Sequence, residues 1–200
     1  MSLDHQMSER VYRDLKEDVL SGVLGGGRLN LASLDERYSS SATPVREALL
    51  RLVGEGLVDL LHRGGFGVHE IDEDGLRDLY ELNFRVLALA TSWRPRPVSP
   101  WPTEIETPSA LNPPIDALFS TVAQRAGSPG YQALVGMLND RLQRARLAEA
   151  MIIPDTLLEY DSLLSIVLSP RRASLRRALT HYHRRRLRIV SEIIRHMKSL

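Results

Sequence analysis

The chain has 200 residues, of which 43% are apolar and 26% charged, a composition typical of a globular protein with one or two domains. It contains no cysteine, which excludes disulfides, thiol catalysis and thiolate metal sites and fits a reducing, cytoplasmic location. The formal net charge is +1, and no apolar run reaches the ~20 residues that span a bilayer, so a membrane partner is not expected.

Two helices are predicted at the start of the chain. Apolar residues recur every three or four positions over residues 8–24, which predicts an amphipathic helix that the glycines at 25–27 terminate. A short helix is expected over residues 34–38, with Ser33 as its N-cap.

The stretch 39–58 predicts a third, strongly capped helix. Thr43 is the expected N-cap, because Pro44 then occupies the first helical position, where a missing N–H costs nothing. Arg46 and Arg51 are expected to face outward. The stripe of apolar residues that would face inward consists of Val45, Ala48, Leu49 and Leu52.

A β-hairpin is expected directly after this helix. Gly54 and Gly56 end the helix, residues 57–61 and 66–71 are the two candidate strands, and residues 62–65 form the turn. Three helices followed by a hairpin is the element order of a winged helix-turn-helix, whose third helix reads DNA.

The second half is predicted to be all helical. Asp72 caps a helix over 73–93, and the segment 94–114 is too rich in proline to continue it. The remaining helices are expected at 114–125 after Asn112, at 131–151, at 155–167, and at 170–196 after Ser169. The fold class is therefore mostly α, with a winged-helix domain over 1–72 and a helical-bundle domain over 73–200.

The charge is unevenly distributed along the chain. Residues 1–75 hold 8 basic and 14 acidic side chains, a net charge of −6, so the remainder carries +7. An acidic first domain counts against DNA binding, unless its arginines and its acids occupy different faces.

The residues of the first domain resemble a known family. The run from Ala42 through Leu49, with Leu52, residues 55–58, Gly65 and Val68, resembles the GntR family of bacterial transcription regulators. The helical second half resembles the FadR-like subfamily and its FCD effector-binding domain. The resemblance implies a cytoplasmic, homodimeric repressor or activator that binds a palindromic DNA operator and responds to a small-molecule effector.

The resemblance also suggests DNA-contacting positions. Arg46 corresponds to the arginine that reads guanine in the major groove, which agrees with the fit of a guanidinium to guanine O6 and N7. Thr43 and Arg51 correspond to backbone- or base-contacting positions, and Gly64 and Gly65 to the wing tip. Arg63, beside them, is a candidate for phosphate contact, with a solvated turn as the alternative. Ala42 stands where the family usually has a second DNA-contacting arginine.

Many FCD domains hold a divalent metal with one aspartate and three histidines. The resemblance places Asp116 at the aspartate and Ser120, Tyr160 and His181 (or His183) at the histidines. Two of the four ligands are therefore missing, so no metal or other cofactor is expected, and Asp116 and His181 are remnants of the metal site. Asp116, Tyr160 and His181 are instead the candidate effector-binding residues, and an organic acid is the expected effector because arginines are abundant nearby.

Two other hypotheses for the function remain open. A metal-dependent enzyme built on the helical domain would need a ligand cluster or an activated nucleophile, and the sequence shows neither, so an enzyme is not expected. A protein-interaction module is favoured only by the acidic first domain.

Overall fold

A computed structural model describes residues 3–92, 114–168 and 172–199, which form two compact units, 1–70 and 71–200. Most of the proline-rich segment 94–114 lies outside the described residues, as do the predicted caps Asn112 and Ser169. The described part is mostly helical with one small sheet, which confirms the predicted fold class. In these ranges every helix is too short or too polar to cross a bilayer.

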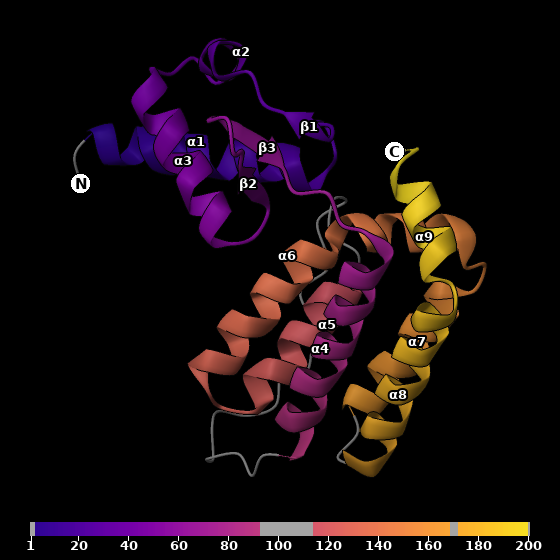
Figure 1. The fold of residues 1–200 in the computed structure, drawn as a ribbon. Coiled ribbons are helices and arrows are strands. Elements are labelled where there is room, and N and C mark those ends of the chain that lie inside the picture. The colour runs from indigo at the N-terminus through magenta and orange to yellow at the C-terminus, as the bar shows by residue number, and fades with distance from the viewer. Residues whose placement is uncertain (1–2, 93–113, 169–171, 200) are drawn as a thin grey trace. The chain divides into compact units, whose positions relative to one another are not determined.

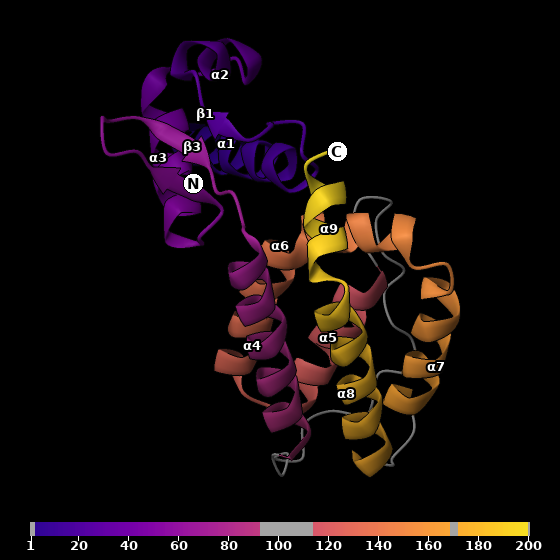
Figure 2. The same ribbon diagram turned by 45° about the vertical axis from the view of Figure 1, so that its right-hand side comes forward.

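The first unit contains three helices and a three-stranded sheet (Figure 1). The helices are α1 (Leu3–Leu20), α2 (Leu31–Arg37) and α3 (Ala42–Gly54). The strands are β1 (Gly27–Arg28), β2 (Val58–Leu60) and β3 (Phe66–Val68) in the order β1-β3-β2, all antiparallel. The hairpin of β2 and β3 confirms the winged helix, and its loop extends away from the helices (Figure 2).

Strand β1 was not predicted. Gly27 pairs with Val68 and Arg28 with Gly67, so the turn after α1 joins the sheet. The backbones approach so closely that a Cβ on Gly67 would lie 3.0 Å from the carbonyl oxygen of Gly27. A two-residue strand has no periodicity of its own, and only this tertiary pairing defines it.

The predicted caps of α2 and α3 were wrong. Asn30, not Ser33, caps α2, because its Oδ1 accepts hydrogen bonds from the N–H groups of Ala32 (3.1 Å) and Ser33 (3.5 Å). Helix α3 begins at Ala42 after Ser41, whose side chain makes no capping bond, so Thr43 already lies in the first turn. Both helices start earlier than predicted because the preceding residue can already adopt the extended N-cap conformation.

The second unit is a bundle of six described helices (Figure 1). They are α4 (Glu73–Ser92), α5 (Pro114–Arg125), α6 (Pro129–Ile152), α7 (Thr156–Leu168), α8 (Arg172–Arg188) and α9 (Val190–Met197). Buried apolar side chains from all six make one continuous core.

The predicted single helix over 170–196 was wrong, because the chain breaks at Ile189. Helix α4 supplies partners at the break. The guanidinium of Arg77 donates to the Leu187 carbonyl at 3.1 Å, and the hydroxyl of Ser191 donates to Glu73 at 2.6 Å. Since another helix satisfies these polar groups, the chain can interrupt its own helical hydrogen bonds there.

The N-cap of α4 gives a direct test of one predicted element. Asp72 Oδ1 accepts a hydrogen bond from the Gly75 N–H at 2.8 Å, as expected of a cap. We expect Asp72→Ala to lower the free energy of unfolding by about 1 kcal/mol. Urea denaturation followed by circular dichroism measures the loss. Asp78→Ala, an exposed change within the same helix, is the control and should have a smaller effect.

Candidate nucleic-acid interface and candidate ligand cavity

Helix α3 presents one buried and one exposed face. The side chains on the inner face are at most 2% exposed, and they are Val45, Ala48, Leu49 and Leu52. Their burial determines which residues of α3 face outward. Arg46 lies on this exposed face, with its guanidinium carbon 5.9 Å from the centre of the Phe66 ring at the start of β3. It makes no ion pair with any described residue. Arg46 is therefore held beside the hairpin with its charge available.

Arg51 is placed differently from Arg46, although both are exposed. Its Nη1 is 2.6 Å from Glu9 Oε1, and its guanidinium lies 3.6 Å from the centre of the Tyr12 ring. The hydrogen bond to Glu9 raises the pKa of Arg51 above its ordinary value. Arg51 thus ties α3 to α1, and a contact with DNA would have to compete with Glu9.

The wing turn depends on two glycines and on Arg28. Gly64 and Gly65 have φ of +78° and +90°, a conformation that side chains with a Cβ rarely adopt. Arg28 on β1 donates from Nη2 to the Gly64 carbonyl at 3.0 Å. Arg63 is exposed at this turn and has no ion-pair partner in the described residues. Sequence reasoning missed Arg28, because its role depends on the unpredicted strand β1.

These contacts explain how an acidic unit can present a basic face. Of its eight basic residues, four form ion pairs with acids among the described residues of the unit. The pairs are Arg13–Asp14, Lys16–Glu55, Arg37–Asp18 and Arg51–Glu9. Arg28, Arg46 and Arg63 form no such pair among the described residues, and all three lie on or beside α3 and the wing. Arginines without an ion-pair partner therefore lie near α3 and the wing, although the unit's net charge is negative.

An exposed helix with an unpaired arginine, next to a wing that carries further arginines, defines the class of protein. The first unit is a winged helix of the kind with which transcription regulators bind DNA. Residues 7–68 match the sequence model described as "Bacterial regulatory proteins, gntR family". The first unit thus matches the DNA-binding part of the GntR family of bacterial transcription regulators.

Two curated relatives match part of the chain. The transcriptional repressor GlaR of Escherichia coli (strain K12) is 33% identical over 82 residues, which cover 40% of this chain and 37% of GlaR. The transcriptional regulator McbR of the same organism is 38% identical over 86 residues, covering 40% of this chain and 39% of McbR. The chain thus matches less than two fifths of the length of these relatives. Both relatives are named as transcription regulators.

Solved structures resemble the chain over nearly its whole length. A putative GntR regulator from Rhodococcus sp. RHA1 has a TM-score of 0.73 at 14% identity and covers 92% of this chain and 97% of its own. Escherichia coli McbR/YncC has a TM-score of 0.64 at 22% identity and covers 93% and 97%. At these identities the likeness shows the fold, a winged helix followed by a helical domain.

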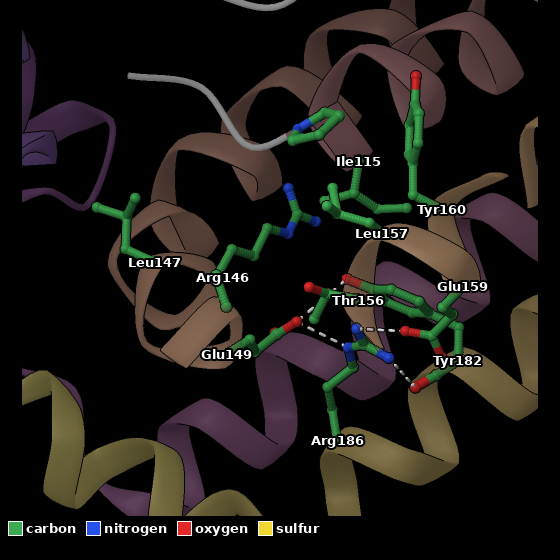
Figure 3. A pocket seen from close by; sticks show the side chains of 12 residues that line it. Ile115, Arg146, Leu147, Glu149, Thr156, Leu157, Glu159, Tyr160, Tyr182 and Arg186 are labelled. Carbon is green, nitrogen blue, oxygen red and sulfur yellow. Dashed lines mark hydrogen bonds and ion pairs between the residues drawn. The ribbon is translucent and has the colours of Figure 1, made fainter. Parts of the chain in front are cut away.

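The second unit contains a cavity of about 200 Å³ among α5, α6, α7 and α8 (Figure 3). The residues that line it are Pro114, Ile115, Arg146, Leu147, Glu149, Ala150, Thr156, Leu157, Glu159, Tyr160, Tyr182 and Arg186. Its surface is mostly apolar, and buried ionised side chains lie along one side. Small-molecule sites in proteins have this combination of apolar walls and a few polar groups.

Arg186 is the centre of one buried ionic cluster. Its Nε is 2.8 Å from Glu149 Oε2, its Nη2 is 2.7 Å from Glu159 Oε2, and its Nη1 donates to the Tyr182 carbonyl at 3.1 Å (Figure 3). Burial alone would lower the pKa of Arg186, but Tyr182 and the two glutamates outweigh it and raise the pKa. Tyr80 on α4 donates to the other oxygen of Glu149 at 2.5 Å.

A second buried pair joins Arg146 of α6 to Asp116 of α5. The two side chains are in direct contact, and Arg146 Nη1 also donates to Asn139 Oδ1 at 3.0 Å. Neither arginine was predicted to be buried in an ion pair, although both interrupt apolar stripes. Arg146 follows the buried Leu138 and Leu142 at intervals of four, and a charged residue on such a stripe is the available sequence signal for a buried ion pair.

The structure does not bring the three predicted effector residues together. Tyr160 lines the cavity, whereas Asp116 is not one of the lining residues and contacts Arg146. His181 is exposed and faces a different hollow on α8. The other residues that line that hollow are Arg177, Thr180, Arg184, Arg185 and Arg188. Consecutive residues of a helix point in different directions, so His181 faces away from the cavity although other residues of α8 line it.

The residues at the remnant metal positions do not fit a divalent ion. Asp116 is paired with Arg146, and Ser120 Oγ receives a hydrogen bond from Asn139 at 3.2 Å. Burial raises the pKa of Tyr160, which disfavours the phenolate form. His183 lies with Nδ1 2.7 Å from the Leu179 carbonyl and Nε2 2.9 Å from Asn83 Oδ1, so both nitrogens are engaged. No group of three or more potential ligands occurs among the described residues.

His183 predicts a pH dependence of stability. Its burial lowers the pKa to about 3 from 6.5, so the folded protein keeps the ring neutral while the unfolded chain protonates it below pH 6.5. The unfolded state then binds more protons, and stability falls as the pH drops from 6.5 towards 3, by up to about 1.4 kcal/mol per pH unit.

We expect His183→Gln to make the free energy of unfolding less sensitive to pH in this range. Urea denaturation at pH 7, 6 and 5 measures the dependence, and the exposed His181→Gln is the matched control. An unchanged slope in His183→Gln would show that other groups cause the acid sensitivity.

Proposed function

We propose that this chain is a sequence-specific transcription regulator, cytoplasmic and homodimeric, whose DNA affinity is controlled by a small organic acid bound in the second unit. In this proposal residues 43–53 of α3 lie in the major groove, and residues 63–65 of the wing contact the minor groove. The proposal rests on the GntR-type winged helix and on the basic face that it presents.

The single observation that carries DNA recognition is the free guanidinium of Arg46. It is exposed on α3, lies against the wing residue Phe66 and has no ion-pair partner among the described residues. A guanidinium can donate two parallel hydrogen bonds to guanine O6 and N7, and this pair discriminates guanine from the other bases. In this proposal Arg28 and Arg63 bind phosphates, and such contacts orient the protein without reading sequence.

The proposed dimer has a consequence for the operator. Two copies related by a two-fold axis would each place one α3 in the major groove, which requires a palindromic site with half-sites about one or two helical turns apart. Repression is the proposed mode of action, and its support is the 33% identity of the matching part to a protein named a transcriptional repressor.

The proposed effector site is the cavity of the second unit. Its support is a mostly apolar surface next to buried arginines, which suits an organic acid. The effector would act by binding one conformation of the regulator more tightly than another with different DNA affinity.

The DNA-reading role predicts the behaviour of Arg46→Ala. We expect this variant to lose about 1–3 kcal/mol of binding free energy on the specific operator, or roughly 5- to 150-fold in affinity, because one base contact is removed. Fluorescence anisotropy with DNA from upstream of the gene measures the loss. Binding to unrelated DNA should weaken much less.

Arg13→Ala is the matched control, since it removes the same charge from an exposed site of α1 that already pairs with Asp14. It should bind the operator with nearly the affinity of the wild type. Equal operator affinity for Arg46→Ala and wild type would disprove the assignment of Arg46. No specific binding by the wild type to any upstream fragment would disprove the regulator itself.

A further inference from the structure

The cavity of the second unit is lined by an arginine, Arg146, with guanidinium N–H groups that lack a hydrogen-bond acceptor among the described residues. The Arg146 side chain is 1% exposed, and of its three nitrogens only Nη1 has hydrogen-bond or ion-pair partners, Asn139 and Asp116. Nε and Nη2 are buried without a hydrogen-bond partner among the described residues. A buried charged donor without an acceptor is costly, so this edge of the guanidinium is a place where an acceptor is expected.

The free edge of Arg146 has a specific shape. Nε and Nη2 point their N–H groups in parallel from one side of the planar guanidinium, and this is the edge that holds a carboxylate with two hydrogen bonds. Figure 3 shows the guanidinium of Arg146 reaching into the cavity towards Ile115 and Leu157, away from Glu149 and Arg186.

Arg186, which also lines the cavity, is an arginine whose guanidinium is fully paired. It contacts two carboxylates, Glu149 and Glu159, through different nitrogens of one guanidinium. Arg146 has the first carboxylate, from Asp116, and lacks the second. We propose that a small monocarboxylic acid supplies the second carboxylate to the Nε–Nη2 edge of Arg146, and that it binds without a metal ion. This inference rests on the proposed effector site and specifies its ligand class.

The rest of the cavity limits what else the ligand can carry. Ile115, Leu147, Ala150 and Leu157 supply apolar surface, and the volume of about 200 Å³ suits a short aliphatic body. A second negative charge is disfavoured, because Glu149 and Glu159 lie on the wall and the positive charge of Arg186 is already shared between them. These features favour a monoanion over a dicarboxylate or a phosphate ester.

The proposal is tested first by ligand chemistry. Butyrate and valerate, each against its own primary amide, are added to the full chain in the presence of EDTA, and the melting temperature is recorded. We expect a carboxylate at about 100 times its Kd to raise the melting temperature by roughly 5 °C or more. The amide of the same shape should give little shift, since it cannot pair with the charge of Arg146.

Two variants then test the site. Arg146→Gln should weaken carboxylate binding by about 10- to 100-fold, the effect of losing hydrogen bonds to a charged group. Arg177→Gln is the matched control, because Arg177 is exposed on α8 in the other hollow. It should bind as the wild type does.

Leu157→Trp guards against loss of folding in Arg146→Gln, which leaves Asp116 buried without its partner. Leu157 lines the cavity but is 70% exposed, so a larger side chain there can obstruct the cavity without entering the core. We expect this variant to keep the melting temperature of the ligand-free wild type and to lose the carboxylate-induced shift.

Several outcomes would overturn the proposal. They are equal shifts with the amides, loss of the shift in EDTA, wild-type binding by Arg146→Gln or Leu157→Trp, and no shift with either carboxylate. Operator binding measured on the same samples separates this inference from the proposed function. If the wild type binds its operator but no carboxylate, the ligand class is wrong and the regulator stands, whereas loss of both removes the regulator as well.

Discussion

The second unit depends on the buried guanidinium of Arg186. It joins α8 to Glu149 of α6 and Glu159 of α7, and Tyr80 extends the cluster to α4. Removing an arginine and two carboxylates from water is costly, and mutual attraction offsets that cost only when the geometry is well matched. Loss of one partner would leave a buried charge uncompensated. The cluster therefore ties α4, α6, α7 and α8 together, and Arg186, Glu149 and Glu159 also line the cavity.

The first unit uses charge in a different way. Its ion pairs are mostly exposed, and pairs of this kind contribute at most about 1 kcal/mol each. Their effect is on the distribution of charge. Glu9 holds Arg51 against α1, while Arg46 stays free beside the wing. A unit with a net negative charge can thus keep an unpaired arginine where a recognition helix would meet DNA.

The sequence predicted the elements well where a local signal existed. Helix α5 begins and ends where expected, and Asp72 caps α4 as expected, because proline and capping residues act within a few positions of themselves. The prediction failed where a tertiary contact decided the outcome. Strand β1 exists through pairing with β3, and the break at Ile189 coincides with partners that α4 supplies. Among the site residues, Arg46 could be found from its motif, but Arg28 could not.

The sequence by itself determined the winged-helix order, the all-helical second half and the resemblance of the first unit to the GntR family, since periodicity, caps and motif spacing are local properties of the chain. Only the tertiary structure decided which charges are free. Arg46 and Arg51 look equivalent on one helix, yet α1 neutralises only the second. Arg146 and Arg186 look like ordinary charged residues, yet packing buries both and satisfies only Arg186. The physical reason is that the energy of a charge depends on its neighbours in space, which positions along the chain do not specify.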